Sequence, residues 1–289
     1  MLAHLPEAAR VAEAFILFLP RREQPRLQHL LRRHRFRRYL RQRLGARFTP
    51  VDPGPAAPPD LVVQTSVLAE RDLATAAEPD AYFAGGYLGS LMHLTTVERF
   101  GFELKAATAV LDFGCGAAKN TRLLRGIQGL RVVGTDVNAA QIEWARKHVP
   151  GIEFHANDRE PPLRFAEDES FDLVTAASVF THIPLDLQRP WLAEIRRILR
   201  PGGYFLCTVA GAHHIRIQLS TELRRLLDRE GHVTLNADDP GVSYATKAAG
   251  SWDVFQTREE VQRSFGSVFE VLSYSASETG QDTLVLRKP

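Results

Sequence analysis

The sequence contains only two cysteines, Cys115 and Cys207, among 289 residues. Two cysteines are too few for a disulfide framework, and such chains are typical of reducing compartments. The sequence also lacks a clear membrane span, which needs about 20 apolar residues. Its apolar run at residues 11–19 contains Glu13, ends at Pro20 and precedes the basic residues that a secretory signal would place first. We therefore expect a cytoplasmic protein.

A large net charge is also absent, because the chain as a whole carries only +2. The charge is nevertheless unevenly distributed, with eleven arginines and a single acid, Glu23, between Arg21 and Arg47. Three interpretations of Arg21–Arg47 stay open: a solvated helix face, a basic amphipathic helix lying on anionic lipid at the membrane periphery, or a docking surface for a protein or polyanion.

Proline and glycine divide the chain into four parts. Residues 1–48 form a basic segment in which two helices are predicted, over Glu7–Leu19 and Arg26–Leu44. Residues 49–60 contain five prolines and are predicted to be a linker. Residues 61–103 are predicted to be a helical lead-in and pocket lid, broken by glycines 85, 86 and 89, and residues 104–289 form the main domain.

The main domain alternates short apolar runs with helical segments. Such alternation requires parallel strands covered on both faces, so we predict an α/β fold with a doubly wound, Rossmann-like, mostly parallel seven-stranded sheet. The predicted strands are Ala109–Phe113, Arg131–Asp136, Ile152–Ala156, Phe171–Ala176, Tyr204–Val209, Phe269–Tyr274 and Thr283–Arg287, the last antiparallel. The predicted helices are Asn120–Ile127, Ala139–His148, Asp186–Leu199, Ile217–Glu230 and Arg258–Phe265.

A substrate-side insertion is expected at about residues 211–264, where the strand–helix alternation stops. Within it, residues 231–256 are predicted to be irregular. Long irregular stretches in compact domains are usually functional.

The first predicted strand runs into a glycine-rich turn, VLDFGCGAA, at residues 110–118. Gly114 and Gly116 allow a sharp turn and a close approach of the backbone to a ligand. Asp136 ends the second strand 22 residues after Gly114, where an acid accepts hydrogen bonds from ribose hydroxyls. The dinucleotide fingerprint requires glycine or alanine at position 119, which is Lys119, so a nicotinamide oxidoreductase is disfavoured.

Four motifs in order resemble those of class I S-adenosylmethionine-dependent methyltransferases: LDFGCGAAKNTR, GTDVN, SFDLVTAASVFTHIP and LRPGGYFLCTV. The resemblance covers about residues 80–289. Within that superfamily the chain is similar to bacterial methyltransferases of surface-glycan and natural-product biosynthesis, which have counterparts of PPLRF, SVFTHI, WLAEIRRILRPGGYF and QDTLVLRKP.

The resemblance implies a binding site for S-adenosylmethionine, with S-adenosylhomocysteine as the product. Asp112, Gly114, Cys115 and Gly116 would hold its methionine end, and Asp136 would bind the ribose diol. The remaining implied cofactor contacts are Val137, Asn157 and Asp158 around the adenine and Ser178 and Phe180 on the methionine side. Asn157 and Asp158 are equally well explained as turn residues.

Two residues depart from the family pattern. Ala118 replaces the usual third glycine, so we expect less room near the cofactor but retained binding. Lys119 stands where the narrower family commonly has arginine.

A hydroxyl acceptor needs a base to remove its proton, and histidine is suited to that task. His182 is the first candidate, followed by His213 and His214, because all three come after the carboxyl ends of predicted strands. His232, Tyr244 and Trp252 of the insertion, with Tyr82 and Tyr87 from the lead-in, are candidates for the substrate pocket. The aromatic residues are equally compatible with anchoring the loops to the core.

The acceptor is expected to be a small molecule or glycan. The Asn/Asp-Pro-Pro-aromatic motif of DNA amino-methyltransferases is missing after the fourth strand, where the chain has AASVF, so no nucleic-acid substrate is expected. No metal-binding pattern is evident. The alternative hypothesis is a non-catalytic cofactor-binding partner of a biosynthetic enzyme.

Overall fold

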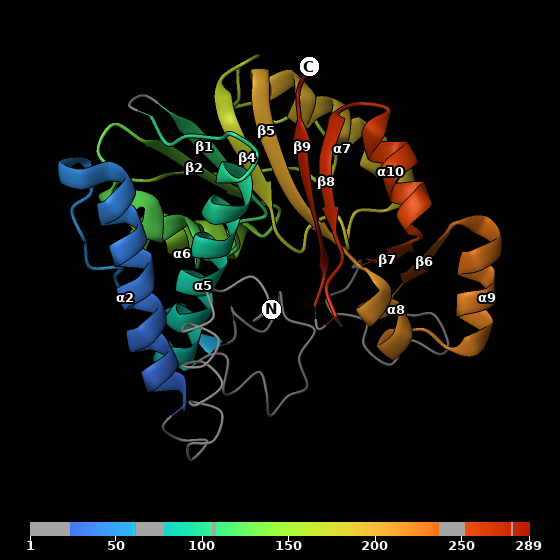
Figure 1. Cartoon of the computed structure of the whole chain (residues 1–289), viewed down its shortest axis with the longest axis horizontal. Helices are drawn as coiled ribbons and strands as arrows, with labels where there is room; N and C mark the ends of the chain where they lie inside the picture. The colour runs from blue at the N-terminus through green and yellow to red at the C-terminus, as the bar shows by residue number, and fades with distance from the viewer. Residues whose placement is uncertain (1–23, 60, 62–77, 106–107, 237–251, 279) are drawn as a thin grey trace.

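The fold is that of a central sheet flanked by helices, as the computed structural model in Figure 1 shows. The structure describes residues 24–59, 61, 78–105, 108–236, 252–278 and 280–289. Its elements, in chain order, are α2 (Gln24–Leu44), η2 (Gly45–Arg47), α5 (Pro79–Glu98), β1 (Ala109–Phe113), η3 (Thr121–Gly126), β2 (Arg131–Asp136), α6 (Ala139–His148), β3 (Glu153–Ala156), β4 (Phe171–Ala176), α7 (Leu185–Ile198), β5 (Leu199–Val209), α8 (Ala212–Gln218), α9 (Thr221–Glu230), β6 (His232–Asn236), β7 (Trp252–Gln256), α10 (Arg258–Gly266), β8 (Glu270–Ser275) and β9 (Asp282–Arg287).

The main sheet has seven strands in the order β3-β2-β1-β4-β5-β9-β8. The first five are parallel, and β9 pairs antiparallel with both β5 and β8. The predicted doubly wound sheet with an antiparallel C-terminal strand is therefore confirmed. The strand order reverses between β1 and β4, and ligands of such sheets bind beyond the carboxyl ends of the strands at this point.

Alternating side chains of the strands fill two hydrophobic cores, one on each face of the sheet. In β1, Leu111 and Phe113 pack toward Trp191 of α7 on one face, and Val110 packs toward α5 and η3 on the other. This period of two is the geometry of a strand buried on both faces. The sheet is therefore covered on both faces by helices. A ligand site of this fold is then expected at the carboxyl ends of the strands.

The arginine-rich helix α2 packs against α5 at the flank of the molecule (Figure 1). Its Phe36 and Leu40 are fully buried, and the His29 ring stacks between Phe83 and Tyr87. Although α2 has 21 residues, its arginines make it polar, and none of the helices in the described residues is apolar enough to cross a bilayer.

Helix α5 continues through the three glycines that were expected to break it. Their role is close packing, because α5 lies directly on the turn that follows β1. A Cβ built on Gly86 would lie 2.6 Å from the carbonyl oxygen of Lys119, and one on Gly89 would lie 3.2 Å from the Asn120 side chain. The helix therefore tolerates residues of low helix propensity because they allow this contact.

The helix predicted over Asn120–Ile127 is present as the 3₁₀ helix η3. Two further predictions of local structure were wrong. The helix predicted over Ile217–Glu230 is divided into α8 and α9, because the Ser220 side chain accepts a hydrogen bond from the Leu223 N–H and begins a new helix. Residues 231–256 were predicted to be irregular, but β6 and β7 pair as a small antiparallel sheet.

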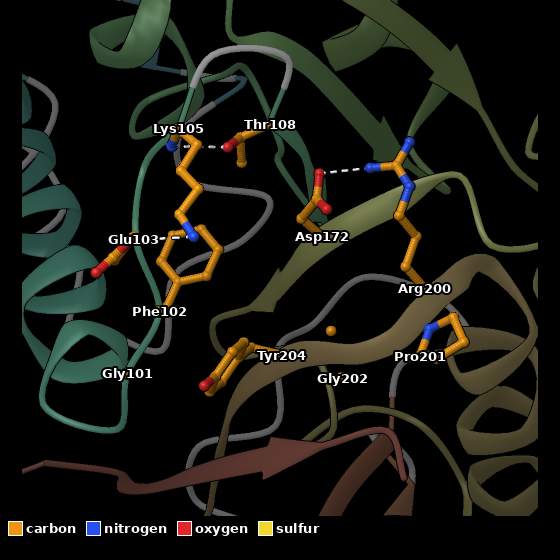
Figure 2. A pocket seen from close by; sticks show the side chains of 11 residues that line it. Gly101, Phe102, Glu103, Lys105, Thr108, Asp172, Arg200, Pro201, Gly202 and Tyr204 are labelled. Atoms are coloured by element: carbon orange, nitrogen blue, oxygen red, sulfur yellow. Dashed lines mark hydrogen bonds and ion pairs between the residues drawn. The ribbon is translucent and has the colours of Figure 1, made fainter.

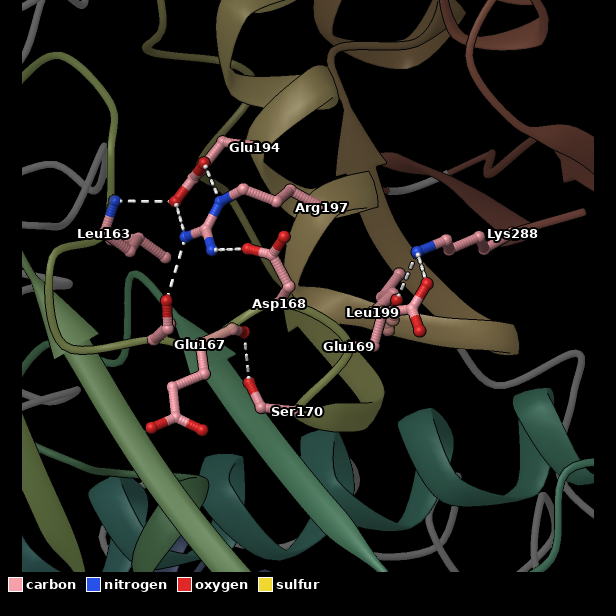
Figure 3. Close-up of polar contacts among 10 residues, drawn as sticks. Leu163, Glu167, Asp168, Glu169, Ser170, Glu194, Arg197, Leu199 and Lys288 are labelled. Atoms are coloured by element: carbon pink, nitrogen blue, oxygen red, sulfur yellow. Dashed lines mark hydrogen bonds and ion pairs between the residues drawn. The ribbon is translucent and has the colours of Figure 1, made fainter.

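A polar network fixes the loop before β4 onto α7 (Figure 3). Arg197 of α7 donates hydrogen bonds to both carboxylate oxygens of Glu194 at 2.7 and 2.8 Å and pairs with Asp168. Glu194, 6% exposed, also accepts the Leu163 N–H at 2.7 Å. Because the buried carboxylate is satisfied from two sides, the network holds the start of β4 in place.

The contact of α5 with the glycine-rich turn predicts that alanine at positions 85 and 86 changes the stability of the protein in opposite directions. Gly86→Ala should lower the free energy of unfolding by about 2 kcal/mol, because its methyl group overlaps backbone. Gly85→Ala should raise it by about 0.5–1 kcal/mol, because a Cβ there meets only the Lys119 amine at 3.9 Å and alanine favours the helix. Urea denaturation measures both, and equal effects of the same sign would contradict this packing.

Candidate active site

The turn after β1, residues 114–118, is a backbone elbow with no room for a side chain at Gly114 and Gly116. Gly114 and Gly116 have φ values of 78° and 54°, in the left-handed region that favours glycine. The N–H groups of Gly114 and Cys115 both donate to the Thr135 carbonyl of β2, at 2.8 and 3.0 Å. A Cβ on Gly114 would lie 2.2 Å from the Val179 side chain. The elbow therefore presents bare backbone at the point where the strand order reverses.

Asp136 bridges the elbow and the tip of β2. Its carboxylate accepts the Gly116 N–H and the Asn138 N–H, both at 2.8 Å. The side chain is 8% exposed, and burial raises the pKa of this carboxyl. A carboxylate has about four lone-pair directions, so two remain to accept the hydroxyls of a ribose diol. Val137 is 56% exposed beside it and offers an apolar surface to a base.

The buried Asp112 side chain at the end of β1 holds the elbow in place through hydrogen bonds to two neighbouring elements. It accepts hydrogen bonds from the hydroxyls of Thr121 on η3 at 2.5 Å and Thr175 on β4 at 3.1 Å. Burial raises the pKa of the Asp112 carboxyl, which its two hydroxyl donors oppose. One buried side chain therefore connects β1, β4 and η3 directly beneath the elbow.

The Cys115 and Ala118 side chains point into a small core beneath the elbow. Both pack with Ile142 and Ala145 of α6, at 8% and 0% exposure. Ala118 adopts φ 59°, a conformation that costs a non-glycine residue about 1 kcal/mol. The Ala118 methyl group, which was expected to reduce the room near the cofactor, is thus fully buried in the core beside α6.

Asn157 follows β3 and lies beside Asp136. Its backbone N–H donates to the Asp136 carbonyl at 3.1 Å, and its side-chain oxygen accepts the Thr135 hydroxyl at 2.8 Å. Its amide donates to the carbonyl of Asp158, which is an exposed residue. The two residues therefore lie beside Asp136, at the carboxyl ends of β2 and β3.

His182 has a defined tautomer. Its Nδ1 lies 2.9 Å from the Trp252 carbonyl oxygen, which only accepts, so Nδ1 carries a proton, and in the neutral imidazole Nε2 is the acceptor. The Asp253 carboxylate lies 3.3 Å from the same nitrogen. The His182 N–H donates to the carbonyl of Val179, the residue that packs against Gly114. The turn from Val179 to His182 therefore connects the elbow to His182, whose ring lies beside the Asp253 carboxylate.

A second polar cluster lies at the carboxyl ends of β4 and β5. Gln281, just before β9, accepts hydrogen bonds from the hydroxyls of Ser178 at 2.9 Å and Thr208 at 2.6 Å. Nearby, His214 donates from Nδ1 to the Gly280 carbonyl, and its pKa is lowered by burial and by His213. The cluster therefore brings Ser178, His213 and His214 close to the residues that precede β9.

The remaining expected pocket residues lie elsewhere. Tyr82 is buried and donates to the Ala117 carbonyl, so it supports the elbow from behind, and burial raises its pKa to about 12. Tyr87 packs between α5 and α2, and Phe180 packs on Phe205 and Phe265 in the core. In this structure Tyr87, expected in the substrate pocket, and Phe180, expected on the methionine side of the cofactor, are core residues that are 3% and 1% exposed. Tyr244 lies outside the described residues.

His232 is also separated from the other histidines. It is exposed and pairs with Gln256 at one end of the β6–β7 sheet, while Trp252 pairs with Asn236 at the other. Four residues of strand separate the two ends by about 13 Å. The structure therefore places Trp252 next to His182 through its backbone and His232 away from it.

A pocket of about 330 Å³ opens at the opposite edge of the sheet (Figure 2). Its wall includes Lys105, which pairs with Glu103, and Arg200, which pairs with Asp172. It lies at the amino ends of β4 and β5, whereas ligands of this fold bind at the carboxyl ends. We therefore do not assign the pocket to the active site.

Sequence analysis missed Asp253, Thr208 and Gln281. Gln281 begins the QDTLVLRKP segment, whose resemblance to the narrower family was a usable signal. Thr208 sits at the end of a recognised strand, as side chains of such sites commonly do. Asp253 had no local signal, since its partner is 71 residues away in the chain.

The comparisons agree with this geometry. Residues 111–207 match the model of a family described as a methyltransferase domain. A probable phthiotriol/phenolphthiotriol dimycocerosates methyltransferase of Mycobacterium ulcerans is 37% identical over 102 residues, 33% of this chain and 37% of its own length. A probable S-adenosylmethionine-dependent methyltransferase of Mycolicibacterium smegmatis is 31% identical over 140 residues, 44% of this chain and 52% of its own length.

A solved structure, the PH0226 protein of Pyrococcus horikoshii, shares the fold. It is 18% identical, has a TM-score of 0.51 and covers 78% of this chain and 95% of its own. The match with the curated relatives spans about a third to a half of their length. The predicted S-adenosylmethionine-dependent methyltransferase domain, with S-adenosylmethionine as its cofactor, is confirmed at the level of the domain.

The raised pKa of Asp136 generates a pH prediction for cofactor binding. Binding requires the charged carboxylate, so S-adenosylmethionine affinity should be full above the raised pKa and fall as the pH drops through it, at a higher pH than for an ordinary aspartate. Asp136→Asn should weaken binding about 10–100-fold at pH 7.5 by removing charge-assisted hydrogen bonds. Calorimetry between pH 5 and 8 measures both effects.

The control is Glu143→Gln, which removes an exposed carboxylate from the neighbouring helix α6. It should leave the affinity and its pH dependence unchanged. An Asp136→Asn protein that binds as tightly as the wild type would remove the ribose role from this residue.

Proposed function

We propose that this chain, in which a class I methyltransferase domain occupies the centre, transfers a methyl group from S-adenosylmethionine to a hydroxyl of a small molecule or glycan. The support for the donor is the elbow with its buried acid, Asp136. The support for a hydroxyl acceptor is the Nδ1 hydrogen bond of His182, which leaves Nε2 available to receive a proton. That hydrogen bond is the observation on which the acceptor assignment rests.

The residues of the crevice fit the cofactor. The bare backbone at Gly114 and Gly116 accommodates the methionine end, and the two free lone-pair directions of Asp136 suit the ribose diol. Val137 and Asn157 offer an apolar face and a fixed amide to the adenine. S-adenosylmethionine, when bound, supplies an activated methyl group on a positively charged sulfur.

The protein's part in the reaction is positioning and proton removal. Holding the acceptor oxygen in line with the methyl group contributes most of the rate, because the reaction is a direct displacement. His182 Nε2 takes the hydroxyl proton as the oxygen attacks, and the Asp253 carboxylate stabilises the resulting imidazolium. The Trp252 carbonyl keeps Nδ1 protonated and thereby keeps Nε2 basic.

The acceptor side carries hydroxyl and amide groups in a fixed arrangement. Thr208 accepts the Ser178 N–H at 2.8 Å and donates to Gln281, so the oxygen of the Gln281 amide is engaged and its amide nitrogen is available to a substrate oxygen. A relative of this chain is named as a probable phthiotriol/phenolphthiotriol dimycocerosates methyltransferase, which favours hydroxyl-bearing molecules as the acceptor class.

Turnover of labelled S-adenosylmethionine against a panel of phenols, sugars and long-chain diols tests the proposal. His182→Gln should lower kcat by about 100-fold or more with little change in cofactor affinity. Asp253→Asn should lower kcat by a smaller factor, and the matched control His232→Gln should leave it unchanged because that residue lies away from the site.

Full kcat in His182→Gln would remove the base assignment and leave the methyltransferase assignment intact. Cofactor binding without turnover on any acceptor would instead favour the alternative, a non-catalytic cofactor-binding partner of a biosynthetic enzyme.

A further inference from the structure

The outward face of α2 carries a stripe of exposed basic and apolar side chains. Its exposed residues Leu27, Leu30, His34, Arg38 and Arg41 recur at intervals of three and four, which places them on one side of the helix. Arg26 is exposed beside them. The opposite face, with Phe36 and Leu40, is buried against α5. The stripe is thus an outer surface of the folded protein and does not take part in its core.

The arginines of α2 fall into two groups. Some serve the fold: Arg43 pairs with Glu98 at 3.4 Å, and burial lowers the pKa of Arg37. Arg26, Arg38 and Arg41 make no hydrogen bond or ion pair to other described residues. Because α2 contains no acid, their charges are not neutralised within the helix.

Two exposed leucines distinguish this surface from a purely ionic one. Leu27 and Leu30 are 37% and 49% exposed and lie one turn apart at the amino-terminal end of the stripe. A phosphate backbone is bound by charge and leaves such side chains in water. An anionic bilayer offers negative headgroups for the arginines and an acyl boundary for the leucines.

We propose that this stripe, residues 26, 27, 30, 34, 38 and 41, docks the protein on the surface of a membrane rich in anionic lipid. The arginines provide attraction to the headgroups, and Leu27 and Leu30 enter the interface to a shallow depth. Helix α2 stays packed on α5 during docking, because the docking face and the buried face are on opposite sides. The methyltransferase fold is thereby brought to the bilayer surface through this face of α2.

Co-flotation of the full chain with vesicles tests the proposal. The wild type should bind vesicles of 30% phosphatidylglycerol in phosphatidylcholine, bind pure phosphatidylcholine weakly, and be released by 0.5 M NaCl. The triple variant Arg26→Gln, Arg38→Gln, Arg41→Gln should bind the anionic vesicles roughly 100-fold more weakly. A matched triple, Arg189→Gln, Arg196→Gln, Arg225→Gln, removes equal charge from exposed positions on α7 and α9 and should change binding less than twofold.

The double variant Leu27→Ser, Leu30→Ser separates lipid from other polyanions. It should weaken vesicle binding severalfold and leave binding to a 30-base-pair DNA duplex unchanged. Equal losses from the two arginine triples would overturn the proposal, as would vesicle binding that is indifferent to both leucines. Wild-type binding to duplex DNA as tight as to vesicles would point to a nucleic-acid surface instead. Because all substituted residues are exposed, thermal unfolding should confirm that each variant is folded.

Discussion

The structure depends on the turn between β1 and η3, where the backbone at Gly114 and Gly116 is packed too closely to carry side chains. Between β1 and η3 the chain passes Val179 at Gly114, Gln141 at Gly116 and the glycines of α5 behind Lys119. The N–H groups of Gly114 and Cys115 donate to the Thr135 carbonyl, and that of Gly116 donates to the Asp136 carboxylate. The two glycines therefore let the turn, β2 and α5 meet closely.

A buried arginine extends this constraint to the N-terminal part of the chain. Arg122, 0% exposed, donates to the carbonyls of Ala117 and Ala118 in the elbow and of Pro55 in the proline-rich segment. Its guanidinium also lies over the rings of Tyr82 and Trp144. Buried charges are stable only where their donors are satisfied, so the proline-rich segment packs as part of the domain that it precedes.

The acceptor side is assembled differently, from segments that meet only in the folded chain. The β6–β7 sheet joins the end of β5 through a bridge between Ala210 and Phe255, and the Val254 N–H donates to the Thr181 carbonyl. These contacts deliver the Trp252 carbonyl and Asp253 to His182. In the proposed reaction, the carboxyl edge of the sheet would hold the donor, and the insertion after β5 would support the base, His182.

The amino-acid sequence alone predicted the strands and the glycine-rich turn, because these depend on interactions between residues close together in the chain. The alternation of apolar runs and helices predicted the parallel strands, because the strand period depends on neighbouring residues. The glycine-rich turn and the later Asp136 predicted two groups at the same sheet edge, and the Gly116 N–H does donate to the Asp136 carboxylate. Tertiary structure alone decided that α5 tolerates its glycines, that Tyr87 and Phe180 are core residues, and that Asp253 supports His182. Each of these depends on the Cβ environment or on a partner distant in the chain, and no pattern within a short window records such contacts.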